Sequence, residues 1–278
     1  MTQNLDTNVW VNQDEAGTIS PFDRGLAYGD GLFATMQTNN GVILLLDAHL
    51  ARLHQGAVRL GINWSPTETF IAHLKQLAAS NPNHCIKVIL SRGNGGRGYM
   101  PPEHAKLTEI TSVHPLPSHY PVWQREGIKL ALSEVELGRQ PLLAGIKHLN
   151  RLEQVLIKAQ PLATDVQDWL VVDTQGKVIE SSMANLFVIK SNKVYTPSMA
   201  YSGVAGVTRE RVIDALLQFG LSVECTEFDV TFLQSCDHVM LSNSLFGVVD
   251  VTAIGNQVFE RFAETKKLTE LIYANEKR

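Results

Sequence analysis

The sequence is short of cysteine, of long apolar runs and of an excess of either charge. Its 278 residues contain three cysteines, Cys85, Cys225 and Cys236, and no Cys-x-x-Cys pair. This pattern argues against a disulfide framework and predicts reduced thiols in a cytoplasmic protein. The spacing of metal ligands is also missing, so we expect no bound metal.

No uninterrupted apolar stretch approaches the roughly 20 residues that span a bilayer, so we expect no membrane contact. The first seven residues are polar and lack the basic start and apolar run of a secretory signal. With 24 basic and 28 acidic residues, the formal net charge is −4. The chain therefore has no basic field for nucleic acid, although a local basic pocket can still bind a small anion.

The composition is that of a globular enzyme, with 44% hydrophobic and 19% charged residues. The length exceeds that of a usual single domain, which predicts two domains. The proline-rich segment 114–121 is typical of a semi-rigid linker. We therefore expect an N-terminal domain over 1–114, a linker over 115–125 and a C-terminal domain over 126–278.

One lysine, Lys147, lies between apolar and small residues in the stretch 143–156. The apolar residues after it recur at helical spacing from Leu149 to Ala159, which predicts a helix with Lys147 at its mouth. A lysine in apolar surroundings has a lowered pKa, so its neutral amine can act as a nucleophile or a base. The alternative is an ordinary surface lysine whose stem lies along the protein.

In the first half, the pattern predicts a half-buried strand up to about Thr38 and a second strand over 42–46 that is buried on both faces. A helix is expected from Asp47 to about Leu60, with Asp47 as its N-cap. Arg52 lies on the other side of that helix from the apolar residues. It is either a solvated surface residue or a clamp for a phosphate.

A glycine-rich loop, 92–99, follows a strand expected over 85–91. Its glycines allow the backbone to approach a ligand, and Arg92 and Arg97 can bind carboxylate or phosphate. The loop lacks the ending of a Walker motif, and no helix pattern follows it. The plainer interpretation is a flexible hairpin tip.

In the second half, Glu180 stands at a strand end before small polar residues, where it faces either a cleft or the surface of a turn. The segment 203–209 carries glycines and Thr208 ahead of a helix pattern. Free N–H groups at a helix start favour an anion, although Thr208 as a simple N-cap is the alternative. In the strand over 239–249, the polar break 242–244 indicates ligand contact.

A reactive lysine, a carboxylate, an arginine and a phosphate seat are the groups that pyridoxal 5′-phosphate requires. At this point the sequence resembles the fold-type IV pyridoxal-phosphate enzymes, which include branched-chain aminotransferases, D-amino-acid aminotransferases and 4-amino-4-deoxychorismate lyases. The resemblance covers nearly the whole chain, and it rests on the following motifs in order: Tyr28 to Phe33, His49 to Leu53, Lys147, Glu180 to Phe187, and Gly206 to Arg209.

The resemblance implies a two-domain fold of the D-amino-acid aminotransferase type, of class α+β or α/β. The N-terminal α/β lobe is the smaller one, and the larger C-terminal lobe contains a β-barrel-like sheet. The resemblance further implies that Lys147 forms a Schiff base with the cofactor and that Glu180 pairs with the pyridine nitrogen. The implied phosphate ligands are Arg52, the backbone at Val207 and Thr208, and one of Asn243 and Ser244.

Within the family, the segments 91–99 and 144–156 look like those of the aminodeoxychorismate lyases of folate synthesis. The branched-chain enzymes usually have a glutamate directly after the aromatic residue of the Tyr-Gly motif, whereas Ala34 and Thr35 follow Phe33 here. The implied reaction converts aminodeoxychorismate to p-aminobenzoate and pyruvate. Thr35 is the candidate for relaying a proton.

For substrate binding, the resemblance implies Tyr28, Arg97 and Tyr99. It also implies a homodimer, in which the Arg97 loop acts in its own or in the partner's site. One alternative is a D-amino-acid or branched-chain aminotransferase on the same fold. A more remote alternative is a non-catalytic anion-binding protein.

Overall fold

The computed structural model describes residues 8–274, so the polar segment 1–7 and the last four residues lie outside the described part. The chain divides into two compact units. The N-terminal unit comprises residues up to 116 together with 147–150, and the C-terminal unit comprises 117–146 and 151 onward. Four residues from the second half of the chain, including Lys147, therefore belong to the N-terminal unit. The domain boundaries expected from the sequence stay a prediction.

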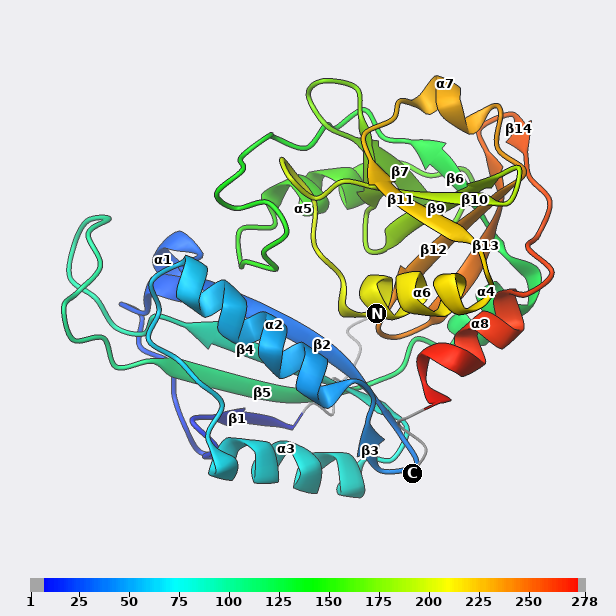
Figure 1. Cartoon of the computed structure of the whole chain (residues 1–278). Helices are drawn as coiled ribbons and strands as arrows, with labels where there is room; N and C mark the ends of the chain where they lie inside the picture. Colours follow the sequence, from blue (N-terminus) through cyan, green and yellow to red (C-terminus); the bar gives the residue numbers. More distant parts are fainter. Residues whose placement is uncertain (1–7, 275–278) are drawn as a thin grey trace. The chain divides into compact units, whose positions relative to one another are not determined.

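The N-terminal unit is an antiparallel sheet with helices packed against it (Figure 1). The strand order is β1-β5-β4-β2-β3. The strands are β1 (Val9–Val11), β2 (Gly31–Asn39), β3 (Val42–Ile43), β4 (His84–Ser91) and β5 (Thr108–Pro115). The helices are α1 (Arg24–Tyr28), α2 (Leu46–Arg59) and α3 (Glu68–Ser80).

Strand β2 shows the alternation that the sequence predicts. Leu32, Ala34 and Met36 are buried, whereas Phe33 and Thr35, which point to the other face, are half-buried. One face of β2 therefore belongs to the core, and the other face offers side chains for function.

The predicted strand over 42–46 is wrong in its second half. Strand β3 ends at Ile43, and α2 begins at Leu46 after Leu45, which has a left-handed backbone with φ of 56°. Asp47 lies in the first turn of α2, and it is not the N-cap. Leu44 and Leu45 are buried, and a short buried apolar run cannot be assigned to strand or helix from its period alone.

The C-terminal unit holds the remaining elements. Its strands are β6 (Ile128–Leu132), β7 (Asp168–Val172), β8 (Val178–Ser181), β9 (Asn185–Lys190), β10 (Lys193–Pro197), β11 (Ser222–Thr226), β12 (His238–Asn243), β13 (Gly247–Ile254) and β14 (Gln257–Val258). Its helices are α4 (Tyr120–Glu126), α5 (Leu152–Ala159), α6 (Val207–Gln218), α7 (Val230–Leu233) and α8 (Thr265–Ile272). Helix α4 thus occupies much of the segment predicted as a linker.

The strands of this unit form a closed barrel. The order β9-β12-β13-β6-β7-β8 returns to β9, because β8 also pairs with β9. Leu186 and Val188 pack in the barrel core, while Phe187 and Ile189 on the opposite face of β9 pack with residues of α6 and α8. The predicted fold class, with a β-barrel-like sheet in the C-terminal lobe, is confirmed.

The helix after Lys147 is shorter than predicted. Helix α5 begins at Leu152, five residues beyond the lysine, and buries Ile157 against β7 and β8. Leu152, Val155 and Leu156, which the periodicity assigned to a buried face, are 77, 60 and 57% exposed. The prediction therefore placed both the start and the buried face of this helix wrongly.

Candidate functional site

Lys147 is held by backbone pairing to β2 and not by the start of a helix. Its carbonyl oxygen accepts a hydrogen bond from the Phe33 N–H at 3.0 Å, and the Leu149 N–H donates to the Gly31 carbonyl at 2.9 Å. The Nζ atom of Lys147 lies 4.4 Å from the centre of the Phe33 ring. The aromatic face contacts the amine, while the extended backbone fixes where it points.

A buried histidine on α2, His49, lies within range of the charges of both Lys147 and Arg52. His49 is fully buried, and its pKa is well below the ordinary value because of burial, first, and then the positive charges of Arg52 and Lys147. Arg52 is half-buried and follows His49 by three residues, so the two lie on one face of the helix. The structure therefore brings two predicted site residues, Lys147 and Arg52, to the same neutral imidazole.

Thr35 lies on the same face of β2 as Phe33, two residues further along. It pairs in register with Lys87 of β4, whose Nζ atom lies 5.5 Å from the centre of the Phe33 ring. The sequence analysis assigns no role to Lys87, although this residue interrupts the apolar run of β4. This face of the sheet thus carries the Thr35 hydroxyl, and the amines of both Lys87 and Lys147 lie near the Phe33 ring.

In the C-terminal unit, Glu180 is 6% exposed. It pairs with Val171 of β7 and Asn185 of β9, and because of a bulge in β8 it lies on the face of the sheet away from the barrel core. Its Oε2 accepts a hydrogen bond from the Val204 N–H at 3.1 Å. Arg151 lies close enough for their charges to interact: burial lowers the Arg151 pKa, and the charges of Glu180 and Glu153 oppose that shift. The sequence analysis assigns no role to Arg151. The carboxylate predicted to face a cleft is therefore buried beside a backbone donor and a cation.

The loop 203–206 leaves no room for side chains at its glycines. Gly203 has a φ of +80°, and a Cβ atom there would lie 2.6 Å from Ile179 and 2.8 Å from Met199. A Cβ atom at Gly206 would collide with Oδ1 of Asn185, whose Nδ2 donates to the Val204 carbonyl at 2.8 Å. This close packing fixes the backbone that leads into α6.

Helix α6 begins at Val207 with Gly206 as its N-cap, so the alternative of Thr208 as the cap is wrong. The N–H groups of the first turn of a helix have no partner within the helix and favour an anion. The Thr208 hydroxyl lies 3.2 Å from the Ser244 hydroxyl. The structure brings these two predicted residues together at the start of α6.

Asn243 has a different setting. Its Oδ1 accepts hydrogen bonds from the N–H groups of Leu245 and Phe246, both at 2.9 Å. Its side chain therefore stabilises the turn between β12 and β13. Of the polar residues in this break, Ser244 is the one beside Thr208.

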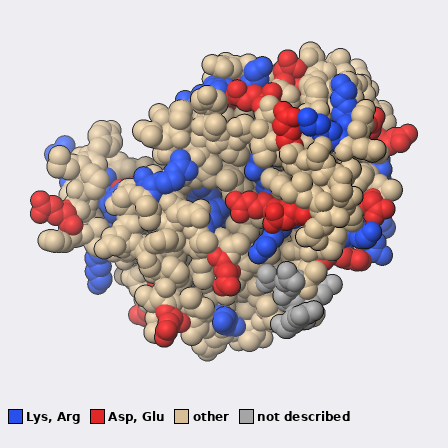
Figure 2. All heavy atoms as spheres, in the orientation of Figure 1, with Lys and Arg blue, Asp and Glu red and all other residues tan. Residues whose placement is uncertain are grey.

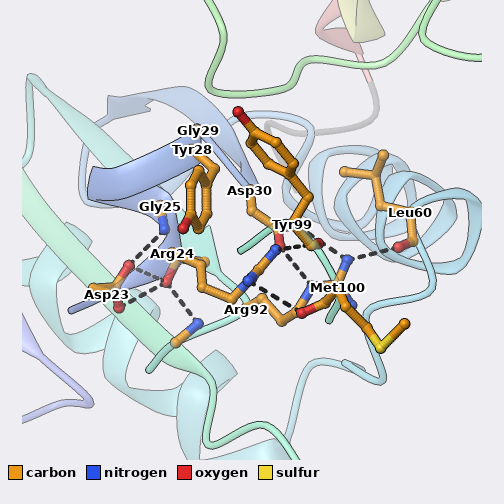
Figure 3. A network of polar contacts seen from close by, with 12 residues as sticks. Asp23, Arg24, Gly25, Tyr28, Gly29, Asp30, Leu60, Arg92, Tyr99 and Met100 are labelled. Atoms are coloured by element: carbon orange, nitrogen blue, oxygen red, sulfur yellow. Dashed lines mark hydrogen bonds and ion pairs between the residues drawn. The ribbon is translucent and has the colours of Figure 1, made fainter. Parts of the chain in front are cut away.

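The predicted substrate residues Tyr28 and Tyr99 lie together in the N-terminal unit (Figure 3). Their ring centres are 5.4 Å apart in an edge-to-face arrangement, and the Gly98 N–H donates to the Tyr28 hydroxyl at 3.2 Å. Arg97 precedes Gly98 and is exposed. All three residues thus belong to one surface, formed by α1 and the glycine-rich loop.

Two further observations concern residues 8–274 only. They contain no cluster of three or more His, Cys, Asp or Glu side chains suited to a metal ion. None of their helices has both the length and the apolar character needed to cross a membrane. On the face in Figure 2, basic and acidic side chains are interspersed.

Comparison with known proteins assigns the family. The model of the class IV amino-transferases matches residues 31–254, which include β2, Lys147, Glu180 and the start of α6. The chain belongs to the class IV aminotransferase family. Enzymes of this family depend on pyridoxal phosphate, in agreement with the cofactor that the sequence predicts.

Class IV relatives include both lyases and aminotransferases. An aminodeoxychorismate lyase from Vibrio harveyi is 40% identical over 245 residues, which cover 88% of this chain and 90% of that protein. The crystal structure of 4-amino-4-deoxychorismate lyase from Pseudomonas aeruginosa is 36% identical, with a TM-score of 0.89 and coverage of 94% of this chain and 97% of that one. A putative branched-chain-amino-acid aminotransferase from Methanocaldococcus jannaschii is 30% identical and covers 94 and 92%. All are enzymes, which argues against a non-catalytic anion-binding protein.

Proposed function

We propose that this class IV protein is an aminodeoxychorismate lyase that converts aminodeoxychorismate to p-aminobenzoate and pyruvate. The observation that carries the proposal is the Lys147 amine over the Phe33 ring, with the Thr35 hydroxyl on the same strand face. The lyase relatives at 40 and 36% identity support this substrate class.

The residues present fit pyridoxal 5′-phosphate. We assign its covalent attachment to Lys147 and the pairing with its pyridine nitrogen to Glu180, a buried carboxylate beside a cation. Arg52 and the first N–H groups of α6, at Val207 and Thr208, are cationic and hydrogen-bonding groups suited to the phosphate.

At the second phosphate segment we choose Ser244 over Asn243, because the Asn243 amide oxygen already accepts two backbone hydrogen bonds. When bound, the cofactor acts as an electron sink that acidifies the carbon bearing the substrate's amino group. The chain's own residues then have to move one proton and hold the substrate.

In the proposed mechanism, the Lys147 amine acts as a base in its deprotonated form and removes the proton from the ring carbon that bears the amino group. The carbon–oxygen bond to the side chain breaks, enolpyruvate leaves, and the ring becomes aromatic. Thr35 relays a proton to the leaving group, and enolpyruvate becomes pyruvate. The pKa of His49 is lowered by burial and by neighbouring charges, so this imidazole does not compete as an acid near the amine.

The second candidate is an aminotransferase on the same fold, favoured by the 30% identical putative branched-chain enzyme. The two are separated by one pair of assays. The lyase releases pyruvate and p-aminobenzoate from aminodeoxychorismate, whereas an aminotransferase passes an amino group from a D-amino acid or a branched-chain amino acid to a keto acid. Transfer without p-aminobenzoate release would support the second candidate.

Lys147→Ala tests the assignment of the amine. We expect p-aminobenzoate release to fall by roughly 10³-fold or more, because the variant lacks both the base and the attachment point. Borohydride reduction followed by peptide mapping should locate the cofactor on Lys147 in the unmodified protein. The matched control is Lys129→Ala, since Lys129 is exposed and paired with Asp165. Full activity of the Lys147 variant would refute the mechanism.

We further propose a cytoplasmic homodimer. The exposed apolar residues of α5, Leu152, Val155 and Leu156, form a face that a second copy would cover. The three cysteines are free thiols, which suits a reducing compartment. Light scattering should give the mass of a dimer, and Leu156→Glu should shift it toward the monomer. A monomeric unmodified protein would contradict this proposal.

A further inference from the structure

Asp30, which directly precedes β2, joins two buried arginines (Figure 3). Its Oδ2 accepts hydrogen bonds from Nε of Arg24 at 2.8 Å and from Nε of Arg92 at 2.7 Å, and its Oδ1 accepts from Nη2 of Arg92 at 3.0 Å. The side chains of Arg24 and Arg92 are 4 and 8% exposed, and that of Asp30 is 14% exposed. One carboxylate thus fixes the planes of two guanidinium groups.

The remaining donors of Arg24 hold the glycine-rich loop. Nη2 donates to the Tyr99 carbonyl at 2.8 Å, and Nη1 donates to the carbonyls of Gly98 and Met100 at 3.1 and 3.4 Å. Three successive carbonyl groups therefore converge on one guanidinium. The stem of Arg24 also limits the loop, because a Cβ atom at Gly95 would lie 2.6 Å from its Cδ.

Arg92 fixes the other side of the network. Its Nη1 and Nη2 donate to the carbonyls of Gly61 and Leu60 at 2.7 and 2.8 Å, just after the last residue of α2. Asp30 therefore connects the end of α2, through Arg92, with the loop that Arg24 holds. The connection runs entirely within the N-terminal unit.

Besides Arg24, Tyr28 contacts this part of the loop through the Gly98 N–H and the Tyr99 ring, and most of its remaining surface is open. Tyr99 and Met100 are 84 and 87% exposed, and no atom lies within 4 Å of a Cβ position at Gly96 or Gly98. Glycine-rich backbone also loses more conformational entropy on ordering than other sequences do. Without the Arg24 hydrogen bonds, the segment that carries Arg97 and Tyr99 would have many accessible conformations.

The carboxylate of Asp30 stays ionised in this setting. Burial by itself raises the Asp30 pKa, but the hydrogen bonds and charges of Arg92 and Arg24 outweigh it, so the pKa is lowered from its ordinary value. The network is therefore complete at neutral pH.

We propose that Asp30 is a positioning residue: by orienting Arg24, it fixes the loop 93–107 and so places Arg97 and Tyr99 to bind the carboxylates of the substrate. The identity of that substrate rests on the proposed function. The fixing of the loop does not, because it follows from the hydrogen bonds of Arg24 to the loop carbonyls.

Asp30→Asn tests both parts. Limited trypsin digestion should cleave after Arg97 at least roughly tenfold faster than in the unmodified protein, because loss of a buried ionic partner frees the loop. The KM for aminodeoxychorismate should rise about tenfold while kcat changes less than about threefold, since Lys147 and Thr35 stay in place. Pyridoxal phosphate binding, followed by absorbance, should be unchanged.

Two variants make the test specific. Arg24→Lys keeps a cation beside Asp30, but the three N–H donors of an ammonium group cannot serve Asp30 and three carbonyls at once, so this variant should reproduce the fast cleavage. Asp250→Asn is the matched control: Asp250 is a buried carboxylate paired with Arg261 in the C-terminal unit, so its loss destabilises the protein away from the loop.

The outcomes separate the loop from the function. Unchanged cleavage in both Asp30→Asn and Arg24→Lys, or equally fast cleavage in Asp250→Asn, overturns the anchoring. Fast cleavage with an unchanged KM overturns the positioning role. Fast cleavage in an enzyme whose unmodified form releases no p-aminobenzoate supports the anchoring and refutes the proposed function.

Discussion

The two glycine-rich segments of this protein, 96–100 and 203–206, use glycine in opposite ways. In 203–206, a Cβ atom at Gly203 or Gly206 would run into neighbouring side chains, so the glycines allow the backbone to pack closely. In 96–100, Gly96 and Gly98 have open space around their Cβ positions, and the segment is held by its carbonyl groups through Arg24. The segment 203–206 is fixed by packing, and the segment 96–100 is fixed by an ionic network.

The difference shows that glycine content alone does not distinguish a rigid ligand seat from a flexible tip. In 203–206, rigidity comes from the close packing of neighbouring atoms around each glycine. In 96–100, the backbone is ordered by charged groups outside the segment, by Asp30 and Arg92 as much as by Arg24. The two loops should therefore respond differently to pH and to added methyl groups.

The largest effect is expected from acid acting on the ionic network. Asp30 has a lowered pKa in the folded protein, so its stabilisation is complete above the ordinary value of 3.8 and is lost as the pH falls through the folded value. At pH 7, Asp30→Asn should reduce the free energy of unfolding by about 3 kcal/mol. Urea unfolding of both proteins from pH 7 to pH 3 measures this difference.

The difference between the two proteins should stay constant from pH 7 to about pH 5 and shrink only below the ordinary carboxyl value. A difference that already shrinks between pH 7 and pH 5 would show that Asp30 is not the titrating group. A difference of zero at pH 7 would remove the contrast between the two loops.

A smaller effect is expected from a methyl group in the packed loop. Gly206→Ala should cost about 2 kcal/mol of stability, because its Cβ atom collides with Asn185 at the start of α6. Under the proposed function, the affinity for pyridoxal phosphate should also fall roughly tenfold. Urea unfolding and cofactor titration measure the two effects.

The control is Gly220→Ala, just beyond the end of α6. Gly220 has a φ of +78° but open space around its Cβ position, so this variant shows backbone strain without a collision. It should leave cofactor affinity unchanged. If Gly206→Ala bound the cofactor as tightly as the control, the packed loop would have no role in the phosphate seat.

The smallest effect is expected at Gly96. Its Cβ position meets no atom within 4 Å, so Gly96→Ala should change stability by less than about 0.5 kcal/mol. Trypsin cleavage after Arg97 should likewise stay within about twofold of the unmodified protein. A marked loss of stability would indicate packing around this loop and would weaken the comparison.

Local patterns predicted much of the fold. The strand expected over 85–91 is β4, which runs from His84 to Ser91, and the alternation along β2 correctly separated its core face from its open face. Period 2 and buried apolar runs are properties of a segment and its nearest neighbours. The barrel was expected from the family resemblance and not from these patterns.

Long-range pairing accounts for what was missed. Asp30 and Arg92 come together because Gly31 pairs with Ser91 in the register of β2 and β4, which no local pattern specifies. Residues 147–150 were expected to lead into a helix, yet they pair with the start of β2. The neighbours of Lys87 and His49 likewise come from segments that are distant in the sequence, so the residue types alone do not predict that these two side chains lie near Lys147 or the Phe33 ring.

The pairing of Lys147 with β2 also sets an order of events during synthesis. The backbone groups of Gly31 and Phe33 that bond to residues 147–149 are made more than a hundred residues before their partners. Because the chain leaves the ribosome from its N-terminus, the backbone groups of Gly31 and Phe33 that face residues 147–149 stay unpaired until that segment is synthesised. The N-terminal unit is completed only when the segment bearing the reactive amine arrives, so a fragment ending at residue 116 would lack both.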